Sequence, residues 1–263
     1  MKKLFILAAL AVMFGFGNSV AAEKIPVDLE LVLAVDVSAS MLSHEKAFVR
    51  DGYVKALGSP QVVEAIQRGP LGRIAVALIE TSAQEGVGVI LPWTIIDSAA
   101  SAQTAAARLA ESPAFEKSPS GTAIGSTLLV SAQMLKQNSY EGTRLVIDMS
   151  GDGPNNTGVE VALARDKVVS QGITINGLPL MTDPNLNGVG TRFNELDQYY
   201  EECVIGGPGA FVIPVTESSH FEKALLRKLI LEIASESNPP IILIRDTGPL
   251  MDCLIGEKEL QAH

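Results

Sequence analysis

The 263-residue sequence contains little cysteine, little histidine and fewer basic than acidic residues. Its two cysteines, Cys203 and Cys253, match no metal-binding spacing. The 20 lysines and arginines are outnumbered by 30 aspartates and glutamates, which gives a formal net charge of −10. A chain this acidic repels a phosphate backbone and gains no counterion-release energy from it, so we expect no nucleic-acid partner.

The three histidines are poor candidates for catalysis. His220 falls in the first turn of the last expected helix, and His263 ends the sequence. His44 has a position that favours a solvated residue in the first turn of a helix. The sequence sets out no arrangement of nucleophile, base and orienting acid such as a Ser/His/Asp triad requires.

Only the N-terminus carries a long apolar run. Lys2 and Lys3 precede a run from Leu4 to about Gly15, and small residues follow up to Ala22, which is the layout of a secretory signal peptide. The alternative, a retained membrane anchor, needs about 20 apolar residues to span a bilayer, and this run is shorter. We expect cleavage after Ala22, which removes two lysines and leaves 241 residues with a net charge of −12. The product should be periplasmic or secreted, soluble and not embedded in a membrane.

Cys203 and Cys253 have two possible states in such a compartment. An isolated pair can form one disulfide under oxidising conditions. The alternative is two separate buried thiols. Because the geometry of the folded chain decides between them, the sequence leaves both open.

Short apolar runs alternate with helical patterns along the rest of the chain. The link over 82–86 is too short for a parallel crossover, so the strands on either side of it should form a hairpin. Strands alternating with helices predict an α/β fold, a Rossmann-like and mainly parallel six-stranded sheet with one antiparallel edge strand and helices on both faces. We expect a domain over 23–237 and a C-terminal tail over 238–263, with strands at 31–35, 73–79, 87–93, 145–147, 173–178 and 210–215.

A carboxylate and two hydroxyls follow the first strand on alternate residues, Asp36, Ser38 and Ser40. Alternate residues of an extended segment point to one side, so the three can face one ion. Ligands of a parallel sheet bind beyond the carboxyl ends of its strands, which is where this loop lies. Hard cations such as Mg²⁺ prefer oxygen ligands of this kind.

This Asp-x-Ser-x-Ser segment resembles the metal-ion-dependent adhesion site of von Willebrand factor A domains. The family has two further elements, a Thr that opens a helix and an Asp-Gly after the fourth strand, and Thr122 and Asp152 match them. The resemblance spans roughly residues 27–233 and implies one bound Mg²⁺, or else Mn²⁺ or Ca²⁺. It implies that Ser38, Ser40 and Thr122 touch the metal, and that Asp36 and Asp152 act mainly through water.

The match around Asp152 departs from the family pattern. Close members often have the Asp directly after the Ser or Thr of the strand, whereas Ser150 and Gly151 both precede Asp152 here. Asp148 is therefore a competitor, although its place inside the strand favours a structural role. The segments 148–156 and 203–211 are similar to motifs of a narrower bacterial exported group of unknown function, DUF1194, which adds no activity.

Three functions are compatible with these residues. The first is a non-enzymatic binding module whose cation accepts an acidic side chain from a protein partner. The second is a metal-assisted hydrolase of phosphoesters or esters, although Ser38 occupies the place of the second carboxylate in an Asp-x-Asp nucleophile pattern. The third is an extracytoplasmic small-ligand receptor. Such receptors have two lobes, and the single run of strands in this chain argues against that arrangement.

Overall fold

The computed structural model describes residues 23–38, 41, 43–83, 86–113, 121–181, 194–234 and 251–261. Ser40, residues 1–22 and most of the expected tail lie outside these ranges, so predictions about them are not tested by the structure. The division into a domain over 23–237 and a tail over 238–263 also stays a prediction. In the described part, no helix is long and apolar enough to cross a membrane.

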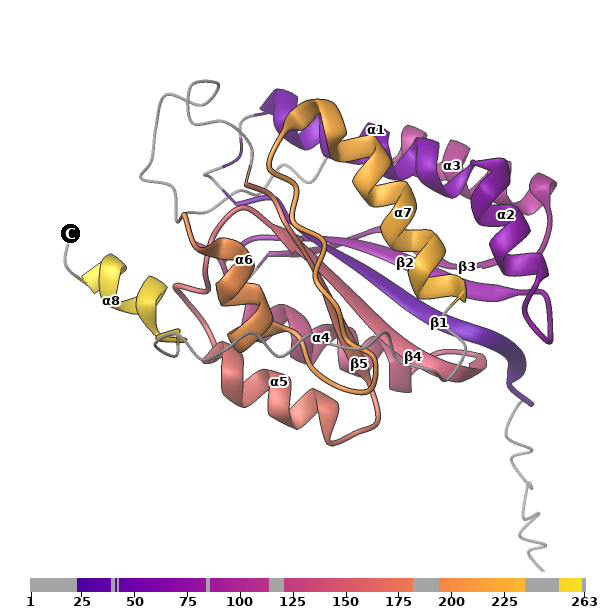
Figure 1. Ribbon diagram of the computed structural model, residues 1–263. Helices are drawn as coiled ribbons and strands as arrows, with labels where there is room; N and C mark the ends of the chain where they lie inside the picture. The colour runs from indigo at the N-terminus through magenta and orange to yellow at the C-terminus, as the bar shows by residue number, and fades with distance from the viewer. Residues whose placement is uncertain are drawn as a thin grey trace, which may run out of the picture.

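The centre of the fold is a twisted sheet with strand order β3-β2-β1-β4-β5 (Figure 1). β1 pairs in parallel with β2 and β4, and β4 pairs in parallel with β5. β3 is antiparallel to β2. The mainly parallel sheet and its antiparallel edge strand are therefore confirmed. The strands are β1 (Ile25–Asp36), β2 (Ile74–Thr81), β3 (Val87–Ile96), β4 (Tyr140–Gly151) and β5 (Thr174–Pro179).

The prediction of a sixth strand over 210–215 is wrong. This segment runs beside β5, but it makes only two isolated parallel bridges, Gly177 to Val212 and Leu180 to Val215. A continuous ladder would need an amide hydrogen at Pro179, between the two bridges, and proline has none. The described part of the sheet therefore has five strands, with an irregular segment along its β5 edge.

Helices cover both faces of the sheet (Figure 1). One face carries α1 (Ser43–Leu57), α2 (Pro60–Gln67), α3 (Ala99–Glu111) and α7 (Phe221–Ala234), the last preceded by the 3-10 turn η3 (Ser218–His220). The other face carries α4 (Ile124–Lys136), α5 (Val161–Val169) and α6 (Leu196–Tyr199), which continues into the π-helical turn η2 (Tyr200–Val204). α8 (Ile255–Gln261) lies at one end of the molecule, beside α6.

The central strand β1 separates two hydrophobic cores. Leu31 and Leu33 pack in the core under α1 and α7, whereas Val32 and Ala34 pack in the core under α4 and α5. A strand buried on both faces reads as a continuous apolar run, which is why β1 was recognisable in the sequence. The alternation continues past Ala34 and directs Asp36, at the end of the strand, to the side of α4.

Candidate metal centre

The candidate centre lies where the strand order of the sheet reverses. β1 and β4 are neighbours in the sheet. After β1 the chain continues into α1 on one face of the sheet, and after β4 it continues into α5 on the other face. Asp36 is the last residue of β1, and Asp152 directly follows β4. Crevices at such reversal points, outside the carboxyl ends of the strands, are the usual ligand sites of open α/β sheets.

Asp36, Ser38 and Thr122 form a compact group of oxygen atoms in this crevice. The Ser38 amide donates to Asp36 Oδ1 at 3.2 Å, and the Ser38 hydroxyl donates to Asp36 Oδ2 at 3.0 Å. The Thr122 hydroxyl lies 3.4 Å from Asp36 Oδ2 and 3.3 Å from Ser38 Oγ, across 86 and 84 residues of sequence. All three residues are buried. The structure thus brings together three of the predicted site residues, while Ser40 lies outside the described residues.

The backbone around Thr122 is fixed by a neighbouring asparagine. The Thr122 amide donates to Asn156 Oδ1 at 2.8 Å, and the Asn156 amide donates to the Thr122 carbonyl at 2.9 Å. Gly121 precedes it with a φ of +120°, a conformation that side-chain-bearing residues rarely adopt. These contacts hold the Thr122 hydroxyl toward Asp36.

The electrostatics of the group favour a cation. Burial, followed by the nearby Asp152 carboxylate, raises the pKa of Asp36 to about 8, although hydrogen bonds from Ser38 and Thr122 act in the opposite direction. A buried carboxylate is costly to ionise unless it is paired with positive charge. A divalent cation between Asp36 and Asp152 would supply that charge. Asp152 itself is only partly buried.

The oxygen spacing fits a small hard cation. Mg²⁺ binds oxygens at about 2.0–2.1 Å in an octahedron, which places adjacent ligand atoms about 3 Å apart. The Ser38 and Thr122 hydroxyl oxygens, the two described atoms expected to touch the metal, are 3.3 Å apart. Within the described ranges, no three His, Cys, Asp or Glu side chains gather as a metal cluster.

A buried tyrosine beside the group adds a second indication. Tyr200 is fully buried, and its hydroxyl has no hydrogen-bond partner among the described residues. A Cβ atom added to Gly151 would lie 3.1 Å from the Tyr200 hydroxyl oxygen and 3.5 Å from Asp36 Oδ2. The hydroxyl therefore points to the same small space as Asp36. No sequence pattern points to Tyr200, because the π-helical turn that presents it has no recognisable pattern.

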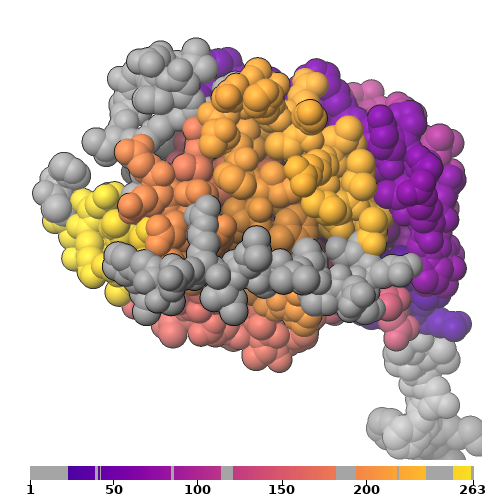
Figure 2. All heavy atoms as spheres, in the orientation of Figure 1, coloured from indigo at the N-terminus to yellow at the C-terminus, as the bar shows by residue number. Residues whose placement is uncertain are grey.

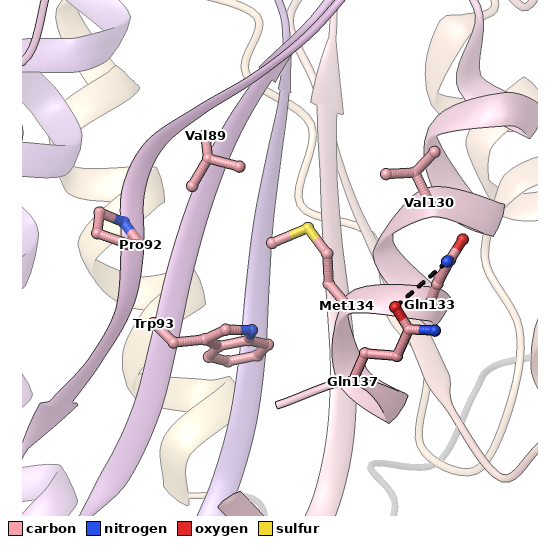
Figure 3. Close-up of a pocket in the computed structure, with 7 residues that line it drawn as sticks. All are labelled: Val89, Pro92, Trp93, Val130, Gln133, Met134 and Gln137. Carbon is pink, nitrogen blue, oxygen red and sulfur yellow. Dashed lines mark hydrogen bonds between the residues drawn. The ribbon is translucent and has the colours of Figure 1, made fainter. Parts of the chain in front are cut away.

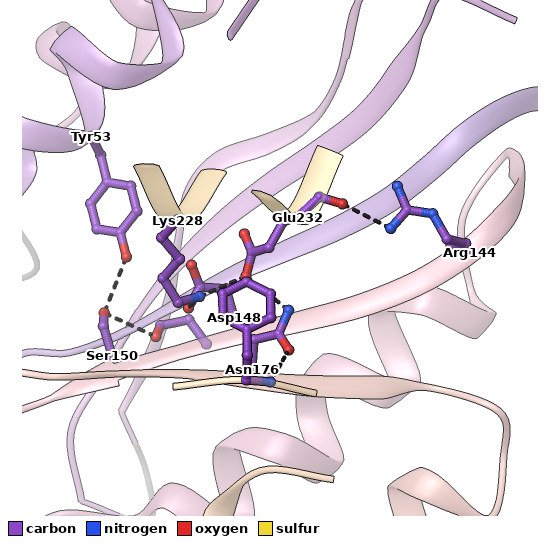
Figure 4. A network of polar contacts seen from close by, with 9 residues as sticks. Tyr53, Arg144, Asp148, Ser150, Asn176, Lys228 and Glu232 are labelled. Atoms are coloured by element: carbon purple, nitrogen blue, oxygen red, sulfur yellow. Dashed lines mark hydrogen bonds and ion pairs between the residues drawn. The ribbon is translucent and has the colours of Figure 1, made fainter. Parts of the chain in front are cut away.

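Asp148 does not belong to this group. Its carboxylate forms an ion pair with Lys228 of α7, on the other face of the sheet, and both side chains are fully buried (Figure 4). Lys228 also bonds to Glu232 at 2.6 Å, and Asn176 donates to the same Glu232 oxygen at 3.1 Å. Nearby, the hydroxyls of Tyr53 and Ser150 lie 3.2 Å apart. Asp148 is thus part of the contact that holds α7 on the sheet.

A separate groove of about 430 Å³ lies between the edge strand β3 and α4 (Figure 3). It shares no residue with the candidate metal centre. Gln137, at its rim, follows the C-terminus of α4, whereas Thr122 precedes the N-terminus of that helix. Its lining is mainly apolar and consists of Val89, Pro92, Trp93, Val130, Gln133, Met134 and Gln137.

Comparison with known families identifies the chain. Residues 26–237 match the family described as "Protein of unknown function (DUF1194)". The chain belongs to this family. A sequence comparison of the DUF1194 chain with curated proteins gives no match.

This DUF1194 protein has the von Willebrand factor A fold, and similar solved structures share the fold at low sequence identity. One is proximal thread matrix protein 1 from the mussel byssus with a zinc-occupied MIDAS motif, at a TM-score of 0.56 and 17% identity over 81% of this chain and 49% of that one. Another is the pilus adhesin SpaC from Lactobacillus rhamnosus GG, with a TM-score of 0.51 and 17% identity over 80% of this chain and 31% of SpaC. BatB from Bacteroides thetaiotaomicron matches with a TM-score of 0.50 and 19% identity over 78% of this chain and 98% of BatB. The chain thus spans about a third of SpaC and half of the mussel protein.

Proposed function

We propose that this DUF1194 protein is an exported binding protein that uses one divalent cation to bind an acidic group of a protein partner. The cation, Mg²⁺ or else Mn²⁺ or Ca²⁺, would be held by Asp36, Ser38, Ser40, Thr122 and Asp152. The observation that carries the proposal is the group of oxygens from Asp36, Ser38 and Thr122, 3.0–3.4 Å apart at the reversal point of the sheet.

The donor set supports binding of an external carboxylate. A cation held by neutral hydroxyls keeps much of its positive charge and attracts a further anionic oxygen. Both Asp36 oxygens accept hydrogen bonds from the protein, which orients the carboxylate as a support for the cation rather than as a free nucleophile or base. This favours a binding role over the metal-assisted hydrolase.

The similar structures support the same type of role. The mussel protein is described with a zinc-occupied MIDAS motif, and SpaC is described as a pilus adhesin. At 17% identity these proteins show only that the fold is shared, and what they bind is not evidence for what this chain binds. A metal-dependent binding role therefore rests on the residues of this chain.

Export is the second part of the proposal. Residues 1–22 have the layout of a cleavable signal peptide. Cys203 and Cys253 form a disulfide with Cα atoms 5.5 Å apart, which is typical of proteins that fold in an oxidising compartment. A mass measurement on the exported protein should give an N-terminus at Glu23, and an exported protein that keeps Lys2 and Lys3 would contradict cleavage after Ala22.

The binding role is tested with short peptides that differ in one carboxylate. An immobilised sample of the protein should retain peptides from an Asp- and Glu-containing set in Mg²⁺ and release them in EDTA. The same peptides with Asn or Gln in place of the acidic residue should not be retained, because the cation then lacks its anionic ligand. Asp36→Ala should abolish retention, whereas Asp166→Ala, at an exposed carboxylate on α5, should leave it unchanged. Retention that persists in EDTA would refute the proposal.

A further inference from the structure

The C-terminal segment 251–261 is fastened to the domain next to the candidate centre. Cys253 is bridged to Cys203 in η2, and the Met251 amide donates to a Glu202 side-chain oxygen at 2.6 Å. α8 follows directly and lies against the segment that contains α6 and η2 (Figure 2, yellow against orange). The disulfide thus delivers α8 to the end of the molecule that carries the metal centre.

α8 makes a close contact with the loop after β4. Asn155 is fully buried, and its side-chain nitrogen donates to Glu257 at 2.7 Å. A Cβ atom added to Gly256 would lie 2.2 Å from the Asn155 carbonyl oxygen and 3.2 Å from the Pro154 side chain. The backbone of α8 can approach this loop only because residue 256 is glycine.

The same loop holds the start of α4 and therefore Thr122. Asn155 Oδ1 accepts the amide of Gly125 at 3.0 Å, and Asn156 Oδ1 accepts the amide of Thr122 at 2.8 Å. A Cβ atom added to Gly125 would lie 2.1 Å from the Val159 carbonyl oxygen, so loop and helix are in tight contact. Direct contacts connect α8, Asn155 and Gly125 at the start of α4, and Thr122 lies three residues before Gly125 in the chain.

We infer that α8 acts as a clamp: by packing on Asn155 it holds the start of α4, and with it Thr122, in the position needed to bind the cation. Gly256, Glu257 and Asn155 are the positioning residues of this clamp. The inference rests on the proposed cation site. A helix as short as α8 is marginal by itself, and the Cys203–Cys253 bridge keeps it beside its docking surface. The C-terminal segment therefore contributes to cation affinity without touching the ion.

Two variants release the clamp in different ways. Gly256→Ala forces the α8 backbone away from Asn155. Because alanine favours helix formation over glycine, a loss of cation affinity in this variant could not be due to a less stable α8 helix. The double substitution Cys203→Ser and Cys253→Ser removes the tether but leaves the contact surface intact. Glu259→Ala, on the exposed side of the same helix, is the matched control.

Two measurements on these variants decide the inference. In metal-free protein, hydrogen exchange at the Gly125 and Thr122 amides should become faster in both variants and stay unchanged in Glu259→Ala. In a Mn²⁺ titration by calorimetry, the dissociation constant of both variants should be up to about tenfold higher than that of the wild type. Tenfold is the lower end of the range for residues that support metal ligands.

The outcomes separate the clamp from the cation site itself. Wild-type protein that binds Mn²⁺, with variants that bind it equally well, would overturn the clamp and leave the proposed function intact. Wild-type protein that binds none of Mn²⁺, Mg²⁺ and Ca²⁺ would overturn both. Unchanged exchange at Gly125 and Thr122 in Gly256→Ala would overturn the clamp whatever the metal result.

Discussion

Asp36 is a buried carboxylate whose hydrogen bonds come from neutral groups, the amide and hydroxyl of Ser38 and the hydroxyl of Thr122. Neutral donors orient a carboxylate but do not neutralise it, and Asp152 adds a second negative charge nearby. Such an arrangement costs free energy in the absence of a counter-charge. At the scale of single residues, a positive charge beside Asp36 would offset this cost.

Tyr200 provides a prediction at this scale. Its hydroxyl is buried beside Asp36 and has no partner in the described part of the protein. If it bonds to water held by the cation, Tyr200→Phe should weaken Mg²⁺ binding by about 10-fold or more. The metal-free protein should be equally or more stable, because removal of an unsatisfied buried hydroxyl costs little. Calorimetric titration and chemical denaturation measure the two effects.

Tyr199→Phe is the matched control for this substitution. The Tyr199 hydroxyl accepts the Asn155 amide at 3.1 Å, so its loss leaves a buried donor unpaired. This variant should lose about 1–3 kcal/mol of unfolding free energy even without metal. If Tyr200→Phe instead destabilises the metal-free protein and leaves Mg²⁺ affinity unchanged, Tyr200 has no role at the centre.

The residues of the centre differ in how far sequence could find them. Asp36 and Ser38 are close in the chain and follow an apolar strand, so their spacing was sufficient. Thr122 and Asp152 were found only through the resemblance to von Willebrand factor A domains, because nothing local links them to Asp36. Tyr200 and Asn155 depend on the tertiary positions of η2 and α8, and short irregular segments do not encode such positions in a pattern.

At the scale of elements, α7 is attached to the sheet by buried charges. Lys228 lies between Asp148 of β4 and Glu232 of its own helix, and all three side chains are buried (Figure 4). Arg144 donates to the Glu232 and Ile233 carbonyls at the end of α7, at 2.8 and 2.9 Å. Two carboxylates share one lysine, so the group has one acidic charge in excess.

This excess predicts a pH dependence of stability. Burial, followed by the nearby Asp148, raises the pKa of Glu232 from 4.5 to about 7. The folded protein therefore keeps a proton that the unfolded chain loses above about pH 4.5. Retention of this proton makes the unfolding free energy fall as pH rises from about 4.5 to about 7, by on the order of 1–3 kcal/mol in total. Below pH 4.5 both states are protonated and the full stability is present.

Glu232→Gln tests this dependence in metal-free protein. The amide cannot ionise and still offers an oxygen to Lys228 and Asn176. Denaturant unfolding between pH 4.5 and 7 should show a shallower decline in the variant than in the wild type. A decline of equal size in both proteins would show that Glu232 ionises alike in the folded and unfolded states.

Element prediction succeeded where apolar patterns were long and failed where a single residue or a distant bond decided the structure. β1 and α4 had clear patterns. The segment 210–215 reads as a strand, but Pro179 on its neighbour removes the donor that would complete the ladder. α8 was not predicted because its position depends on the bridge to Cys203, for which the sequence offered two alternatives.

At the scale of the whole molecule, a sheet between two hydrophobic cores holds loops from three parts of the chain at one edge. β1 supplies Asp36, the loop after β4 supplies Asp152, and the start of α4 supplies Thr122. These three segments meet beyond the carboxyl ends of β1 and β4 and make up the candidate site. The C-terminal segment joins the same edge through Cys253 and α8.

The central claim is that the folded protein binds one divalent cation at this edge. Thermal unfolding should be measured in EDTA and in millimolar Mg²⁺, Mn²⁺ and Ca²⁺, for the wild type and the Asp36→Ala and Thr122→Ala variants. Thr104→Ala, at an exposed threonine on α3, is the control. A cation bound only by the native state at 100 times its dissociation constant adds about 2.7 kcal/mol, or roughly 5–10 °C in Tm for a domain of this size. The account predicts this rise in the wild type and in Thr104→Ala and its loss in the other two; no rise with any of the three metals would contradict it.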